Sequence, residues 1–255
     1  MTVFNHRDGV HLQINDVRIY YEQQGNQDGP ALLLLHGGLG DMQTFNYLTA
    51  HLGKTYRLLG IDSQGHGRST LGYSPLTYRR IQEDMEAVIQ HLGVASASII
   101  GHSDGGIVAL RSAASGSAWI DKLITIGAHW SLSLDDPTRE MYANITAADW
   151  YEKFPLEVER YLAVNPEPDF DRLMATVRQL WLDESEAGYP GESVRDIRAS
   201  LMVVRGDEDQ LVSRANVVEL ADRVTGATFL NLPFTDHSVQ ESQPQWLLPV
   251  LDAFL

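Results

Sequence analysis

Short β-rich runs alternate with longer helical segments along most of this 255-residue chain. In the helical segments apolar residues recur every three or four positions, as at Ile81, Met85 and Val88. Because strands joined by helices lie parallel, this alternation predicts a mostly parallel sheet with helices on both faces. The predicted strands are 10–14, 17–24, 31–35, 56–61, 98–101, 122–127, 200–205 and 228–232, and the predicted helices are 42–52, 77–92, 104–114, 214–224 and 243–255.

Two segments depart from the alternation. Near the start, Asn15-Asp16 supplies the two-residue turn of an antiparallel hairpin. From 131 to 198 no β-rich run occurs, and aromatic residues are scattered among acidic ones. We therefore predict that 131–198 forms a helical cap inserted over the edge of the sheet. The segments 1–130 and 199–255 are expected to form the α/β core together.

The charge balance and the cysteine count exclude several classes of protein. There are 19 Lys and Arg residues against 34 Asp and Glu, so a formal net charge of −15 repels nucleic-acid phosphates and anionic lipids. The absence of cysteine excludes disulfides, thiolate metal sites and a cysteine nucleophile. The start lacks the apolar core of a signal peptide, and the longest aliphatic run, Ala31–Leu35, cannot span a bilayer. We expect a cytoplasmic globular protein, monomeric or homodimeric, that binds neither nucleic acid nor membrane.

The strongest functional motif is the Gly-His-Ser-Asp-Gly sequence at 101–105, which follows an apolar run and opens a helical segment. A residue on so sharp a strand-to-helix turn has a cramped backbone, and the flanking glycines remove Cβ atoms that would clash. Such a turn exposes the Ser103 hydroxyl beside the free N–H groups of a helix N-terminus. The alternative is an ordinary turn that only begins a helix, but the strand and helix on either side favour a nucleophile.

A serine hydroxyl is a weak nucleophile near neutral pH, so Ser103 needs a base and an acid that orients the base. Among nine histidines, His237 follows the last predicted strand, where a loop can bring an imidazole over a central serine. Asp207 and Asp209 follow the strand 200–205 and are the candidate acids, and Asp209 has the better spacing from the preceding glycine. The resulting chain order of serine, aspartate and histidine is the one expected for this type of turn.

A glycine-rich loop follows the buried strand Ala31–Leu35 and has the sequence His-Gly-Gly-Leu-Gly at 36–40. Its glycines allow backbone N–H groups to approach a ligand closely, as an oxyanion hole requires. The alternative is a loop that cradles a phosphate. The sequence is not a Walker A motif, because no Gly-Lys-Ser/Thr follows, and it does not fit GxGxxG.

With these motifs in this order, nearly the whole chain resembles the α/β-hydrolase superfamily. It is most similar to small capped serine esterases of the valacyclovir hydrolase and haloperoxidase-like types. The matching segments are the His-Gly-Gly loop at 36–38, Asp-Ser-Gln-Gly-His-Gly-Arg-Ser at 62–69, the serine turn, the acid loop and the terminal histidine loop. The resemblance implies an eight-stranded sheet with a helical cap after the sixth strand.

The resemblance also assigns roles to residues. It implies a triad of Ser103, Asp209 and His237, with the amides of Gly38 and Asp104 as the oxyanion hole. Haloalkane dehalogenases and many epoxide hydrolases of the superfamily carry an aspartate nucleophile, so Ser103 argues against both activities.

The expected function is hydrolysis of a small-molecule carboxylic ester, with an aminoacyl ester as one candidate, through an acyl-enzyme. This chemistry requires no metal and no organic cofactor, and the histidines lack the spacing of an HExxH metal motif. One alternative is hydrolysis of a carbon–carbon bond in a diketone-like substrate, which uses a similar triad. Another, of a different class, is a ligand sensor that keeps the triad and signals through its cap.

Two residues are predicted to contact the substrate. Trp130 comes directly after the strand 122–127 and is expected at the carboxyl edge of the sheet, near Ser103. Asp104 is expected to bind a cationic group, because the similar valacyclovir hydrolase carries the same Ser-Asp-Gly-Gly run and acts on aminoacyl esters. The alternative role of Asp104 is to complement the positive end of the helix that it begins.

Overall fold

An eight-stranded sheet in the order β1-β2-β4-β3-β5-β6-β7-β8 runs through the centre of the computed structural model, which describes residues 3–255. Strands β3 to β8 run parallel to one another, whereas β2 pairs antiparallel with both β1 and β4. The strands are β1 (Val10–Ile14), β2 (Val17–Gly25), β3 (Ala31–Leu35), β4 (Arg57–Ile61), β5 (Ala97–His102), β6 (Ile120–Ile126), β7 (Ser200–Gly206) and β8 (Thr228–Leu232). The predicted mostly parallel eight-stranded sheet is confirmed.

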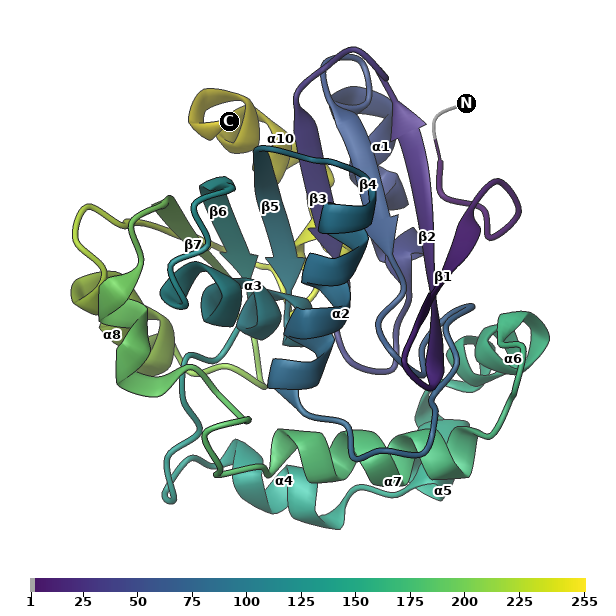
Figure 1. Cartoon of the computed structure of the whole chain (residues 1–255). Helices are drawn as coiled ribbons and strands as arrows, with labels where there is room; N and C mark the ends of the chain where they lie inside the picture. The colour runs from purple at the N-terminus through teal and green to yellow at the C-terminus, as the bar shows by residue number, and fades with distance from the viewer. Residues whose placement is uncertain (1–2) are drawn as a thin grey trace.

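Helices cover both faces of the sheet (Figure 1). Outside the segment between β6 and β7 they are η1 (Met42–Phe45), α1 (Asn46–Leu52), α2 (Tyr78–His91), α3 (Asp104–Ala114), α8 (Arg214–Arg223), α9 (Val239–Ser242) and α10 (Pro244–Phe254). The predicted helix 42–52 is thus a 3₁₀ turn followed by an α-helix, because the Asp41 side chain caps Gln43 and starts a tight turn first. The short helix α9 carries no periodic apolar signal of its own and was not predicted.

The alternation of side chains along each strand divides the core into two layers. All five residues of β3 are buried. Leu33 and Leu35 belong to the layer that also contains residues of α2, α3 and α8, whereas Leu32 and Leu34 belong to the layer that contains residues of α1 and α10. A strand buried on both faces must be apolar throughout, which explains the continuous run of aliphatic residues.

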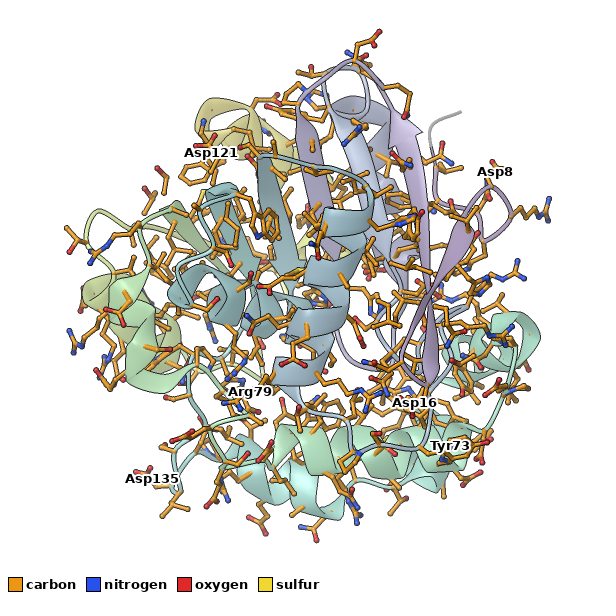
Figure 2. The ribbon with its side chains drawn as sticks, in the orientation of Figure 1. Asp8, Asp16, Tyr73, Arg79, Asp121 and Asp135 are labelled. Atoms are coloured by element: carbon orange, nitrogen blue, oxygen red, sulfur yellow. The ribbon has the colours of Figure 1, made fainter. Side chains whose placement is uncertain are left out.

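The antiparallel hairpin at the start forms as predicted. Ile14 pairs with Val17, and Asn15 in the connecting turn has a positive φ of 51°. Asparagine tolerates this left-handed conformation better than most residues. Asp16, in the same turn, lies beside Tyr73 and accepts a hydrogen bond of 2.9 Å from its backbone N–H (Figure 2).

The segment between β6 and β7 contains four α-helices and a 3₁₀ helix, and no strand occurs there among the described residues. They are α4 (Thr138–Asn144), α5 (Ala147–Lys153), α6 (Pro155–Val164), α7 (Phe170–Trp181) and η2 (Gly191–Asp196). Figure 1 shows α4 to α7 across the carboxyl ends of the strands, in the region for which a cap is predicted. The apolar face of α7 is buried, whereas α5 has no buried residue. The division of the chain into core and cap stays a prediction.

Within residues 3–255, no helix combines the length and the apolar character needed to cross a bilayer.

Candidate active site

Ser103 lies on a sharp turn between β5 and α3. Its backbone angles, φ 51° and ψ −119°, are strained for a residue with a side chain. A Cβ at Gly101 would lie 2.5 Å from the carbonyl oxygen of Gly105, and a Cβ at Gly105 would lie 2.2 Å from that of Leu35. Both positions therefore require glycine. The turn is held on its other side by a hydrogen bond of 2.8 Å from the Ser103 N–H to the carbonyl oxygen of Ile126, at the end of β6.

His237 and Asp209 form a hydrogen-bonded pair beside this turn. The distance from His237 Nδ1 to Asp209 Oδ2 is 2.9 Å. The other carboxylate oxygen, Oδ1, accepts hydrogen bonds of 2.8 and 3.0 Å from the N–H groups of Leu211 and Val212. Burial alone would raise the pKa of Asp209, but the contact with His237 and these N–H groups together hold it below its ordinary value.

The end of β6 brings the pair toward Ser103. A Cβ at Gly127 would lie 2.9 Å from the His237 ring and 3.1 Å from Asp209 Oδ2, so the pair rests directly on this glycine. His237 also contacts the residue before Ser103, because its carbonyl oxygen accepts a hydrogen bond of 3.2 Å from His102 Nε2. The three predicted triad residues therefore all follow the carboxyl ends of parallel strands, β5, β7 and β8, and His237 contacts the residue before Ser103. A contact between His237 and Ser103 itself stays a prediction.

The alternative acid, Asp207, faces elsewhere. Its Oδ1 accepts a hydrogen bond of 2.8 Å from Asn231 and lies 3.9 Å from the Arg205 guanidinium, and half of its side chain is exposed. Of the two candidates, only Asp209 contacts His237.

The glycine-rich loop lies against the serine turn. A Cβ at Gly37 would be 3.0 Å from Ser103 Cβ, and a Cβ at Gly38 would be 2.5 Å from Asp104 Oδ2. His36 fixes the start of the loop: its Nε2 accepts a hydrogen bond of 2.9 Å from the Ser63 N–H, so its Nδ1 donates to the Gly37 carbonyl oxygen at 2.7 Å. The loop and the helix N-terminus thus meet beside the serine, where an oxyanion hole is predicted.

Comparison with known proteins identifies the family. Residues 32–250 match the alpha/beta hydrolase family. The chain belongs to this family.

Three similar proteins show the extent of the similarity. The hydrolase is 27% identical over 239 residues to the mouse serine hydrolase BPHL (Mus musculus), covering 89% of this chain and 79% of that protein. It is 39% identical over 95 residues to the magnesium-chelatase 30 kDa subunit of Rhodobacter capsulatus, covering 35% of this chain and 32% of that protein. A meta-cleavage product hydrolase of Pseudomonas fluorescens IP01 shares the fold at a TM-score of 0.83 and 19% identity, with 98% of each chain covered.

Several relatives match this chain only over part of their own length. Three curated relatives with 32–39% identity are each spanned by the hydrolase for only about a third of their length. The solved structures therefore show the fold alone, and none of these relatives shows a particular substrate for this chain.

Asp104 of the hydrolase is buried and surrounded by hydrogen-bond donors from distant parts of the chain. Tyr78 donates to its Oδ1 at 2.8 Å, and the Trp181 indole N–H lies 3.1 and 3.0 Å from the two carboxylate oxygens. Burial raises the pKa of Asp104, although these donors and the nearby His36 and His237 oppose the shift. Among the described residues, no cationic side chain forms an ion pair with Asp104.

Trp130 contacts a different part of the molecule. The guanidinium of Arg223, on α8, lies 4.0 Å above the centre of its ring, and the backbone of Trp130 is bonded to Asn216 and Gly191. The predicted contact of Trp130 with the substrate stays a prediction.

Tyr78 and Trp181 belong to this site and were not among the residues predicted from the sequence to line it, whereas His102 was expected there from its place at a strand end. Tyr78 and Trp181 reach Asp104 from 26 and 77 positions away, and no local motif signals such contacts. His102 precedes the nucleophile candidate, and its ring lies 4.9 Å from that of His237. Burial and the neighbouring His237 lower the pKa of His102 to about 3, so it is a neutral donor to the His237 backbone.

Within the part of the chain that the structure describes, no three His, Cys, Asp or Glu side chains gather so as to hold a metal ion.

Proposed function

We propose that this hydrolase cleaves a small carboxylic ester through an acyl-enzyme formed on Ser103. The observation that carries the proposal is the strained turn of Ser103 beside a hydrogen-bonded pair of His237 and Asp209, 2.9 Å apart. A serine needs such a pair to lose its proton at neutral pH, and a positive φ at a non-glycine residue is typical of a functional position.

In the proposed mechanism, Ser103 Oγ attacks the carbonyl carbon of the ester while His237 Nε2 accepts its proton. Asp209 accepts the hydrogen bond from His237 Nδ1 and stabilises the imidazolium that forms. The N–H groups of Gly38 and Asp104 stabilise the oxyanion, and losing one such donor typically costs ~2.7–4 kcal/mol. His237 returns the proton to the leaving alcohol. A water molecule, deprotonated by the same imidazole, then releases the acid from Ser103.

An aminoacyl ester is a candidate within this class. The Asp104 carboxylate lies next to Gly38, and its only described hydrogen-bond partners, Tyr78 and Trp181, are neutral. A substrate ammonium group would supply the positive charge that this carboxylate lacks. It would also offset the negative charge of Asp104 beside the developing oxyanion.

A second candidate reaction is hydrolysis of a carbon–carbon bond. The observation that favours it is the similarity to the meta-cleavage product hydrolase, at a TM-score of 0.83 over 98% of each chain. The same serine, histidine and aspartate can serve both reactions, so the groups that bind the substrate decide between them. A ligand sensor with an unused triad is the candidate of another class.

One experiment separates these candidates. Purified wild type and Ser103→Ala are assayed with p-nitrophenyl esters, aminoacyl esters and a vinylogous diketone that is split at a carbon–carbon bond. We expect the wild type to hydrolyse esters and Ser103→Ala to be inactive, and a fluorophosphonate to label Ser103 in the wild type. Turnover of the diketone alone would replace ester hydrolysis by carbon–carbon cleavage. A wild type that turns over none of these substrates would contradict an enzymatic function.

A further inference from the structure

Arg205 carries a buried positive charge near the end of β7. It is 6% exposed, and all three nitrogens of its guanidinium donate hydrogen bonds to backbone carbonyl oxygens. Nε donates to Val212 at 2.9 Å, Nη2 donates to Asp209 at 2.9 Å, and Nη1 donates to Asp207 at 3.1 Å. All three acceptors belong to one segment, residues 207–212, which we call the acid loop.

The same loop fixes the Asp209 carboxylate. Its Oδ1 accepts from the N–H groups of Leu211 and Val212, and its Oδ2 lies 2.9 Å from His237 Nδ1. Val212 takes part in both sets of bonds, because its N–H donates to Asp209 and its carbonyl oxygen accepts from Arg205. Arg205 therefore holds both the backbone of the acid and a residue that orients the carboxylate.

The acid loop is also bonded to the segment that carries His237. The N–H of Glu208 donates to the carbonyl oxygen of Thr235 at 2.8 Å, and Thr235 lies two positions before His237. The guanidinium of Arg205 bonds to the residues on either side of Glu208. A change in the loop around Arg205 would therefore move Asp209 relative to His237.

A charged side chain at this position needs an explanation, because an apolar one would avoid the cost of burying a charge. The only ion pair described for Arg205 is with Asp207, whose Oδ1 lies 3.9 Å away on a half-exposed side chain. The carbonyl groups of surface loops can bond to water, whereas three of those in the acid loop bond to one buried guanidinium. A planar group with N–H donors in fixed directions suits this arrangement.

We propose that Arg205 is a positioning residue, which holds the acid loop in the conformation that presents Asp209 to His237. Its effect on turnover rests on the proposed function, in which this pair activates Ser103. Arg205 acts only through the loop. A misplacement of about 1 Å in such a constellation can cost about 10²-fold in rate, so the bonds to the loop should be visible in the kinetics.

Arg205→Lys and Arg205→Met test the proposal with a p-nitrophenyl ester. Lysine keeps the charge, but its single ammonium group cannot replace three guanidinium nitrogens that bond to three separate carbonyl oxygens. We expect Arg205→Lys to lower kcat by about 10²-fold and to keep KM within about threefold, because the substrate contacts are unchanged. Arg205→Met, which removes every donor, should lose at least as much.

Arg68→Gln is the matched control. Arg68 is also a partly buried arginine that donates to a backbone carbonyl oxygen, but its acceptor is His6 in the N-terminal segment. Its replacement should affect stability and leave kcat unchanged. Thermal unfolding of all three variants shows whether a loss of activity follows the loss of stability.

The proton on His237 Nδ1 reports the position of Asp209 without turnover. In Ser103→Ala, a strong hydrogen bond from this proton to the carboxylate should give a downfield signal in the proton NMR spectrum. Its absence from Ser103→Ala/His237→Gln assigns the signal. We expect it to persist in Ser103→Ala/Arg68→Gln and to be lost or shifted upfield in Ser103→Ala/Arg205→Lys.

The outcomes separate this proposal from the proposed function. In an active enzyme, an unchanged kcat in Arg205→Lys would overturn the positioning role, as would a lower kcat with an unchanged NMR signal. An equal loss of kcat in Arg68→Gln, or unfolding of both Arg205 variants, would give Arg205 a structural role and also overturn it. A signal that depends on Arg205 in a protein that cleaves no ester would support the positioning role while the proposed function fails.

Discussion

At the scale of single residues, Asp207 and Asp209 provide a comparison within one loop. The two carboxylates are two positions apart, yet one is buried against His237 and the other is half exposed near Arg205. Asp209→Asn should lower kcat by about 10⁴-fold, because an amide presents its N–H to His237 and reverses the tautomer that the mechanism needs.

Asp207→Asn should keep nearly full activity. Stability should be kept in Asp209→Asn too, because the amide oxygen can still accept from the N–H groups of Leu211 and Val212. Steady-state rates and thermal unfolding of both variants check these expectations. An active Asp209→Asn would mean that another group orients the histidine.

Asp104 allows a second prediction at this scale. If its carboxylate binds a substrate ammonium group, the wild type should prefer an aminoacyl ester over its des-amino analogue by about 10- to 100-fold in kcat/KM. Asp104→Asn should abolish the preference while keeping an acceptor for Tyr78 and Trp181. Because burial raises the pKa of Asp104, the preference should also fade as the pH falls and the carboxylate is protonated.

One result would contradict the prediction that Asp104 binds an ammonium group. A wild type that prefers the des-amino ester would leave Asp104 with the role of complementing the start of α3. Rates for the two esters from pH 5 to pH 8, measured on both proteins, decide between the two roles.

Individual residues also show how much of the candidate site could be predicted from the sequence. Ser103, Asp209 and His237 could be selected because each follows a recognisable strand, and parallel strands end at one edge. Their catalytic roles stay predictions. The hydrogen bonds from Tyr78 and Trp181 to Asp104 could not be foreseen, because they join segments whose relative position is set by tertiary packing and by no local pattern.

At the scale of elements, α2 carries a buried acid on its apolar face. Asp84 is 5% exposed, and its Oδ2 has no hydrogen-bond partner among the described residues. Burial raises the pKa of Asp84 to about 7, with Arg80 opposing the shift and Glu83 and Asp16 adding to it. The helix therefore holds a proton near neutrality that the unfolded chain releases near pH 4.

The stability of the protein should depend on this proton. Because the folded state binds it more tightly, the free energy of unfolding should fall as the pH rises from about 4 to about 7 and change little above that. Asp84→Asn should remove this part of the pH dependence and stabilise the protein at pH 8 by about 1–4 kcal/mol. Urea unfolding at pH 5 and pH 8 measures the effect. The exposed neighbour Glu83 gives the control Glu83→Gln, and a pH dependence that persists unchanged in Asp84→Asn would contradict the assignment.

Elements differed in how well their sequences specified them. The strands were predictable, because runs such as Ala31–Leu35 are apolar throughout and only a strand covered on both faces needs that. Short elements were harder to predict from the sequence. The 3₁₀ helix η1 depends on the side-chain cap from Asp41, and α9 has only four residues. The absence of strands in 131–198 could be predicted from the sequence. The orientation of α4 to α7 could not, because it depends on packing across the sheet edge.

At the scale of the whole molecule, the N-terminal segment is tied to the centre of the sheet. His6 Nε2 lies 2.9 Å from Asp62 Oδ2, both side chains are buried, and Glu22 accepts from the N–H groups of Asn5 and His6. Burial alone would lower the pKa of His6, but Asp62 and the charges of Asp41 and Glu22 raise it overall. The stabilisation is thus fully present below about pH 6.5, the unfolded value, and is lost as the pH rises through the raised pKa.

His6→Ala should therefore destabilise the protein by about 1.5–3 kcal/mol at pH 5.5 and by less at pH 9. His11→Ala, at an exposed histidine of the same segment, is the control and should have a small effect. Denaturant unfolding at the two pH values measures both. Since Asp84 acts in the same direction, we expect the wild type to be most stable on the acidic side of neutrality, and a maximum above pH 8 would contradict both assignments.

The hydrogen bond between Gly191 and Trp130 also bears on how such a protein can change during evolution. The Gly191 N–H donates to the carbonyl oxygen of Trp130 at 3.0 Å, so the chain leaves the core and returns to it at nearly the same point. The sixty residues between them form a closed excursion, and η2 then carries the chain back along α3 to β7. Insertions, deletions or wholesale replacement within that excursion leave the strand order and the crossover untouched. Selection can therefore remodel these sixty residues while the strands that precede Ser103, Asp209 and His237 are kept.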